Sequence, residues 1–145
     1  MAWQKVRGVL VQGHRVASGL GGDTRFPGGT LALQRPHFAE RGLDLSIFFH
    51  GTLNISIAPK QFRVVEAPRT FRNVKWAAEE PSEDFSFFDC RVEGRKGLIY
   101  YPHPETKPEH FQPPDVLEIL TSEIPNLSYA DELAVEIPIQ QLLIE

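Results

Sequence analysis

Apolar and polar residues alternate along many short stretches of the chain, which is the pattern of β-strands with one buried face. The clearest stretch is residues 52–58, where Leu53, Ile55 and Ile57 alternate with polar side chains. Comparable patterns predict further strands at residues 6–12, 30–34, 61–66, 70–76, 85–92, 97–101 and 132–137, and a strand or helical turn at 116–120. Many short strands with short connections are typical of a β-barrel or β-sandwich.

Prolines and glycines interrupt these stretches and leave little room for long helices. The chain has 12 prolines and 11 glycines among 145 residues. Residues 36–42 are expected to form a short helix, because Pro36 suits a first helical turn and Gly42 suits the position after the last one. Residues 93–96 are expected to be the turn of a hairpin, and the acidic residues 79–84, with Glu83 and Asp84, a solvated turn. We predict a mainly β protein with a single domain over residues 1–145.

The amino-acid composition excludes some classes of binding partner and some cellular locations. A net charge of -4 without a cluster of Lys and Arg argues against a nucleic-acid partner. No apolar run is long enough for a membrane span or a signal peptide, so a cytoplasmic protein is expected. The single cysteine, Cys90, lies in a predicted strand and is interpreted as a small core residue rather than a nucleophile.

The segment Gly51-Thr52-Leu53-Asn54 is the first candidate site. Thr52 and Asn54 are two residues apart in a predicted strand, so both side chains should project from one face while Leu53 points into the core. A hydroxyl and an amide oxygen side by side are hard ligands suited to Mg²⁺ that carries a phosphorylated ligand. The alternative is an exposed polar strand face without a ligand.

Two loops are further candidates. Residues 18–29 are rich in glycine, which lets backbone N–H groups converge on phosphate oxygens, and Arg25 could add charge. This loop has neither the P-loop nor the dinucleotide-binding spacing, and a plain surface loop is the alternative. Residues 101–110 form a proline-stiffened loop that could hold polar groups in place, although His103 and His110 lack the spacing of a zinc site.

These motifs occur in a recognisable order. A strand at residues 8–13 precedes the glycine-rich loop, and a helix-like stretch at 34–42 precedes Gly51-Thr52-Leu53-Asn54. Pro102, Thr106 and His110 follow, then an apolar segment at 116–120 that contains Glu118, and a final turn and strand at 129–137. The order, together with the Gly-Thr-Leu-Asn motif, resembles the archaeal CTP-dependent riboflavin kinases, a family of cradle-loop β-barrels.

The resemblance implies a six-stranded cradle-loop-type β-barrel with one or two short helices. It also implies a kinase that transfers the γ-phosphoryl group of a nucleoside triphosphate to riboflavin, forming FMN, with Mg²⁺ held by Thr52 and Asn54. The flavin would contact Thr106, Glu118 and His110, and Glu118 is the candidate general base. The implied nucleotide contacts lie in the glycine-rich loop, at Gly13, Gly19, Gly21, Gly22 and Arg25.

Several points stay open. Residues 121–126 contain no Lys or Arg where the family has a basic segment, so the donor could be CTP or another nucleotide. Either residues 13–19 or residues 19–25 could be the nucleotide loop. A non-catalytic barrel that binds a flavin or another small ligand, and a purely structural barrel, are the alternative functions; a monomer or a small homo-oligomer is expected.

Phosphoryl transfer requires the metal and acceptor groups to meet, so Thr52, Asn54, Glu118 and the loop 101–110 are expected to share one cavity.

Overall fold

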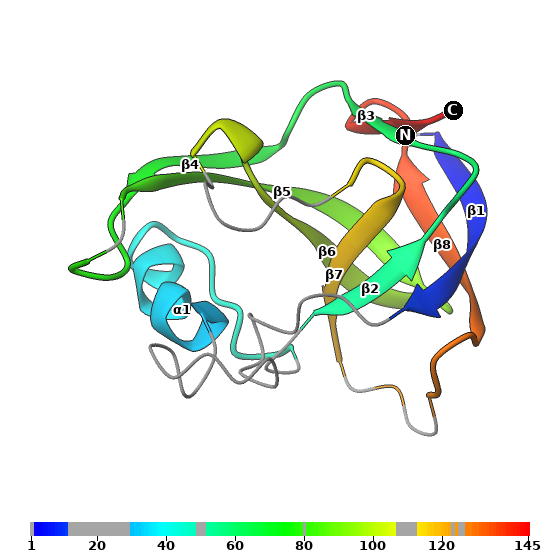
Figure 1. Cartoon of the computed structure of the whole chain (residues 1–145), viewed down its shortest axis with the longest axis horizontal. Helices are drawn as coiled ribbons and strands as arrows, with labels where there is room; N and C mark the ends of the chain where they lie inside the picture. The colour runs from blue at the N-terminus through cyan, green and yellow to red at the C-terminus, as the bar shows by residue number, and fades with distance from the viewer. Residues whose placement is uncertain are drawn as a thin grey trace.

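The computed structural model describes residues 2–11, 30–48, 52–79, 81–106, 113–122, 124 and 127–145. These ranges contain nine strands, one α-helix and one 3-10 helix (Figure 1). The elements are β1 (Trp3–Val11), α1 (Thr30–Glu40), β2 (Leu53–Ser56), β3 (Phe62–Val64), β4 (Arg69–Val74), β5 (Glu83–Val92), β6 (Arg95–Pro102), η1 (Pro104–Thr106), β7 (Val116–Thr121), β8 (Glu132–Pro138) and β9 (Leu142–Ile144).

Six antiparallel strands close into a barrel. Their order is β5–β6–β7–β2–β1–β8, and β8 pairs again with β5 through Val135 and Val92. Strand β4 extends the sheet beyond β5, while β3 and β9 form a separate two-stranded sheet. The predicted mainly β fold with a six-stranded barrel is therefore confirmed.

Two hydrophobic clusters lie on opposite faces of the barrel wall. The first fills the barrel interior and consists of Val6, Leu10, Ile55, Ile57, Phe88, Cys90, Val92, Ile99, Leu117, Ile119, Leu133, Val135, Ile137 and Leu142. The second lies between α1 and the outer face of β4–β7 and consists of Leu31, Phe38, Leu43, Leu45, Phe48, Val74, Trp76, Phe85, Phe87, Leu98, Tyr100 and Leu120. Strand alternation sends neighbouring residues of β6 and β7 to different clusters, so both faces of this wall are packed.

Helix α1 corrects the prediction of a strand at residues 30–34. It begins at Thr30, so Pro36 lies inside the helix and not near its start. Leu31, Gln34 and Phe38 are all at most 2% exposed, and their spacing puts them on one helical face against the sheet. No helix in the described ranges is long and apolar enough to cross a membrane.

The end of α1 agrees with the sequence pattern. Gly42 has φ 98, a left-handed conformation that glycine adopts without a steric penalty. The Gly42 N–H donates to the Ala39 carbonyl at 3.1 Å, and the Leu43 N–H donates to the Phe38 carbonyl at 2.9 Å. Together these two bonds form a Schellman motif, which satisfies carbonyl groups at the end of the helix.

The predicted hairpin between residues 85 and 101 is present, with a tighter turn and longer strands. Val92 pairs with Arg95, and the two residues between them, Glu93 and Gly94, have φ 49 and 77. Two consecutive positive φ values are characteristic of a type I′ turn, which matches the twist of a hairpin. The expected solvated turn at Glu83 and Asp84 is wrong, because both residues belong to β5 and the buried Glu83 carboxylate accepts a hydrogen bond from Trp76 Nε1 at 2.7 Å.

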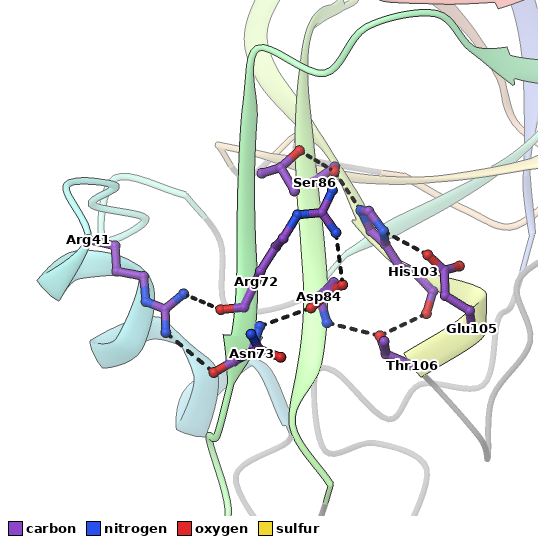
Figure 2. Close-up of polar contacts among 9 residues, drawn as sticks. Arg41, Arg72, Asn73, Asp84, Ser86, His103, Glu105 and Thr106 are labelled. Atoms are coloured by element: carbon purple, nitrogen blue, oxygen red, sulfur yellow. Dashed lines mark hydrogen bonds and ion pairs between the residues drawn. The ribbon is translucent and has the colours of Figure 1, made fainter.

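Strand β4 is bent by a bulge that side chains from two elements hold. Asn73 has φ 55, and the register to β5 shifts between Phe71 and Val74. The Asn73 N–H donates to Asp84 Oδ1 at 2.9 Å. Arg41, the first residue after α1, donates to the carbonyls of Arg72 at 2.7 Å and Asn73 at 3.5 Å (Figure 2). The bulge is thus connected both to the helix and to β5.

Cys90 lies in the barrel interior at 2% exposure, as its interpretation as a core residue predicts. Burial, and secondarily the charge of Asp89, raise the pKa of the Cys90 thiol far above its ordinary value. The thiolate is the reactive form, so the native thiol should resist modification.

The buried thiol also predicts a pH dependence of stability. In the unfolded chain Cys90 ionises near pH 8.5, whereas in the folded protein it stays protonated, so its contribution is lost as pH rises above about 8.5. Between pH 7.5 and 9.5, the free energy of unfolding should fall by about 1.4 kcal/mol more in the wild type than in Cys90→Ala. Urea titrations at both pH values measure this difference, and equal pH dependence in the two proteins would contradict it.

Candidate functional site

The candidate site is built on a polar pair across two barrel strands. In the register of β2 and β7, Asn54 lies directly opposite Glu118. Side chains in such a cross-strand pair have Cβ atoms about 4.5–5.5 Å apart and project from the same face. Residues that are 64 positions apart in the sequence therefore place an amide and a carboxylate side by side.

The neighbouring residues show which face carries the pair. Ile55 and Leu117, the next cross-strand pair, are both in the barrel interior. Because alternate residues point to opposite faces, Asn54 and Glu118 lie on the outer face. Leu120, two residues after Glu118, belongs on that same face to the cluster under α1. The pair is consequently on the helix side of the wall.

Burial distinguishes the members of the predicted metal site. Asn54 is only 9% exposed, which the prediction of a residue facing a solvent-reachable cavity did not anticipate. Leu53 is half-buried and packs against the barrel interior, in agreement with strand alternation. Thr52 is half-buried and lies immediately before the first residue of β2. The amide of Asn54 is thus held in a partly desolvated position next to Glu118.

Two further polar side chains lie close to the pair. The Tyr100 hydroxyl of β6 donates to Gln34 Oε1 of α1 at 2.5 Å, and these residues are 4% and 2% exposed. Burial raises the pKa of Tyr100 well above its ordinary value, and the Glu118 and Glu83 carboxylates raise it further. The phenol therefore stays neutral and keeps its hydrogen bond to Gln34 over the physiological pH range.

The oxygen atoms at this site fit a hard cation. Among the described residues, no group of three or more His, Cys, Asp and Glu side chains could hold a metal ion. Thr52 and Asn54 supply hydroxyl and amide oxygens, which are hard ligands suited to Mg²⁺. Mg²⁺ also retains several waters and binds substrate phosphates, so a few protein oxygens are sufficient. The donor set therefore fits magnesium.

Thr106 lies in a different polar group, which we call the His103 cluster (Thr70, Asp84, Ser86, His103, Glu105 and Thr106). The Thr106 hydroxyl accepts from the Asp84 N–H at 2.9 Å and donates to the His103 carbonyl at 3.2 Å (Figure 2). Figure 1 shows η1, which contains Thr106, on the side of β4 and β5 opposite to α1. The structure thus brings Asn54 and Glu118 together and places Thr106 apart from the helix side.

The His103 cluster contains a serine–histidine–carboxylate chain. Ser86 Oγ is 2.6 Å from His103 Nε2, and His103 Nδ1 is 3.2 Å from Glu105 Oε1. Ser86 Oγ is also 2.8 Å from Thr70 Oγ1, and Ser86 is only 3% exposed on a central strand. A serine nucleophile must be reachable by its substrate. We therefore assign the hydrogen bonds among Ser86, His103 and Glu105 a structural role in joining β4, β5 and η1.

The remaining predicted contacts lie outside the described residues. These are the nucleotide-loop residues Gly13, Gly19, Gly21, Gly22 and Arg25, and the flavin-contact residue His110. They stay predictions from the family resemblance.

Sequence reasoning missed Gln34 and Tyr100. Gln34 is the last residue of the strand that the sequence predicts at residues 30–34, and Tyr100 lies in a stretch, Leu98-Ile99-Tyr100-Tyr101, without polar alternation. Their proximity to Glu118 depends on helix docking and strand register, for which the sequence contains no local signal.

No protein-family model matches the chain, and no curated protein sequence matches it. A functional assignment therefore depends on the polar pair on the helix side of the barrel and on the order of sequence motifs.

Proposed function

We propose that this protein is a small-molecule kinase that transfers the γ-phosphoryl group of a nucleoside triphosphate to riboflavin, with Mg²⁺, and forms FMN. The observation that supports the proposal is the cross-strand pair of Asn54 and Glu118. It puts a candidate metal ligand next to a candidate acceptor-binding carboxylate, and these two groups must be close for phosphoryl transfer.

Each residue has a distinct role in this proposal. Glu118 binds the acceptor hydroxyl and takes its proton onto a carboxylate oxygen. The acceptor oxygen forms a bond to the γ-phosphorus while the bond between that phosphorus and the β-phosphate oxygen breaks, which yields FMN and the nucleoside diphosphate. Thr52 and Asn54 would hold Mg²⁺, which when bound neutralises phosphate charge.

The direct test is to incubate the purified protein with riboflavin, Mg²⁺ and CTP, ATP, GTP or UTP in turn, and to separate FMN from riboflavin by chromatography with fluorescence detection. Formation of FMN with at least one nucleotide is expected, and the panel identifies the donor. Riboflavin binding without turnover with any nucleotide would favour the alternative of a flavin-binding barrel. If the protein neither binds riboflavin nor forms FMN, both functional alternatives fail and only the fold assignment remains.

Asn54→Ala should lower the rate of FMN formation and raise the Mg²⁺ concentration needed for half-maximal rate. Loss of an outer-shell partner of a metal typically costs about 10–100-fold, and loss of a direct ligand should cost at least as much. Asn54→Asp retains a hard oxygen and should retain more activity than Asn54→Ala.

Ser56→Ala is the matched control for this prediction. Ser56 follows Asn54 by two residues on β2, and its hydroxyl contacts only the Ala58 N–H among the described hydrogen bonds, at 3.4 Å. Its replacement should leave the Mg²⁺ dependence unchanged. Identical Mg²⁺ titrations for Asn54→Ala and Ser56→Ala would rule out a metal-binding role for Asn54.

A further inference from the structure

Tyr100 continues the polar pair into a row across three adjacent strands. Ile99 of β6 lies opposite Ile119 of β7, and one more step of this antiparallel register brings Tyr100 opposite Glu118. On its other side, Glu118 is paired with Asn54 of β2. In register, Glu118 therefore lies between Asn54 and Tyr100, and all three side chains project from the helix side of the wall.

Tyr100 is held in place from several directions. Its ring lies 5.8 Å from that of Phe85 and 6.0 Å from that of Phe87. Its hydroxyl donates to Gln34 of α1, and both residues are buried. A ring packed on two others and fixed by a hydrogen bond has little freedom to move. Tyr100 thus forms a rigid wall on one side of Glu118.

The protonation state of Tyr100 defines which roles are available to it. Burial and the neighbouring carboxylates of Glu118 and Glu83 raise its pKa well above the ordinary value, so the phenol is neutral at working pH. A phenol whose single proton is donated to Gln34 is not an acid or base for the substrate. The role that remains for Tyr100 is to control the position of the Glu118 carboxylate.

We propose that Tyr100, oriented by Gln34, is a positioning residue that fixes the Glu118 carboxylate toward the acceptor hydroxyl. The inference rests on the proposed kinase function and adds α1 to the active site, because Gln34 belongs to that helix. In-line transfer requires near-ångström alignment, and a displacement of about 1 Å can lower the rate about 100-fold. A small shift of Glu118 should therefore be visible in kcat.

Tyr100→Phe is the sharpest variant, since it keeps the ring and its packing and removes only the hydroxyl. We expect about a tenfold lower kcat, less than the loss for a full 1 Å displacement, with an unchanged KM for the nucleotide. Gln34→Leu removes the other partner and should have the same effect. If the two residues act through one hydrogen bond, the double variant should be no slower than either single variant.

Tyr101→Phe is the matched control. The loop that the sequence predicts at residues 101–110 does not include Tyr101 in the structure, because β6 extends to Pro102. Tyr101 lies on the face of β6 opposite to Tyr100, where its ring contacts Phe62 at 5.9 Å between centroids. The same chemical change there should leave kcat unchanged. Rates are expressed per folded protein from a thermal melt of each variant, so that a purely structural effect changes the melting temperature but not kcat.

The outcomes separate the two proposals. A wild-type protein that forms no FMN overturns the kinase function and the positioning role together. An active wild type in which Tyr100→Phe is as fast as Tyr101→Phe overturns the positioning role alone. Additive losses in kcat for Tyr100→Phe and Gln34→Leu would also overturn it, because they would show that the residues act independently.

Discussion

Replacement of Glu118 by glutamine is expected to lower the rate of FMN formation by about 10²- to 10⁴-fold, the usual contribution of a general base. The substitution keeps the size and shape of the side chain but replaces one acceptor oxygen by an NH2 donor, so the side chain cannot take the proton of the acceptor hydroxyl. Since Glu118 lies opposite Asn54 in the register, the amide should be accommodated without a change in fold. Initial rates at saturating riboflavin and nucleotide, with circular dichroism as a check on folding, measure the effect.

A matched carboxylate on another strand provides the control for Glu118→Gln. Glu132 of β8 is 65% exposed in its side chain and forms a 3.5 Å ion pair with Arg7. Exposed ion pairs contribute little to stability, so Glu132→Gln should be as active and as stable as the wild type. A Glu118→Gln variant with more than half of the wild-type rate would exclude Glu118 as the base.

Replacement of Phe38 by alanine is expected to lower the free energy of unfolding by about 3–5 kcal/mol. Phe38 is fully buried, and its ring lies 5.1 Å from both Phe85 and Phe87 and 5.8 Å from Phe71. Truncation removes these aromatic contacts and leaves a cavity under α1 that rigid strands cannot fill.

Urea titration of Phe38→Ala and of Leu33→Ala measures this difference. Leu33 is on the same helix but 42% exposed, so its truncation should have a much smaller effect. The comparison removes the change in helix propensity, which is small for both residues. Equal losses in the two variants would show that the cluster between α1 and the sheet is not the main attachment of the helix.

The alternation of apolar residues predicts most of the strands, because a half-buried strand has a direct signature in sequence. The same signature is misleading at residues 30–34, where Leu31 and Leu33 alternate with other residues as in a strand. In the structure, Leu31 and Phe38 are buried on one helical face and Leu33 is exposed. A short apolar pattern fits both periods, and here docking on the outer face of the sheet decides in favour of the helix.

The candidate site is less accessible to sequence reasoning. The spacing of Thr52 and Asn54 is a local signal, whereas their proximity to Glu118 depends on the register of two strands far apart in the chain. A shift of one residue in that register would turn Glu118 to the other face. The sequence also predicts that Thr106 converges with Asn54 and Glu118. In the structure, the Thr106 hydroxyl bonds instead with the Asp84 N–H and the His103 carbonyl.

The contact of Arg41 with the β4 bulge also bears on how the protein behaves at high concentration. Within the described residues, β4 is paired on one side only, and such an edge offers free carbonyl and N–H groups to a strand from another molecule. Arg41 occupies the carbonyls of Arg72 and Asn73, and the bulge bends the strand away from a flat geometry. Arg69 and Arg72 of this strand form ion pairs with Asp89 and Asp84 of β5, so their charges are compensated within the molecule. Two molecules that approach through β4 would meet a bent strand whose carbonyls at the bulge are already bonded, which protects this edge against strand-to-strand aggregation.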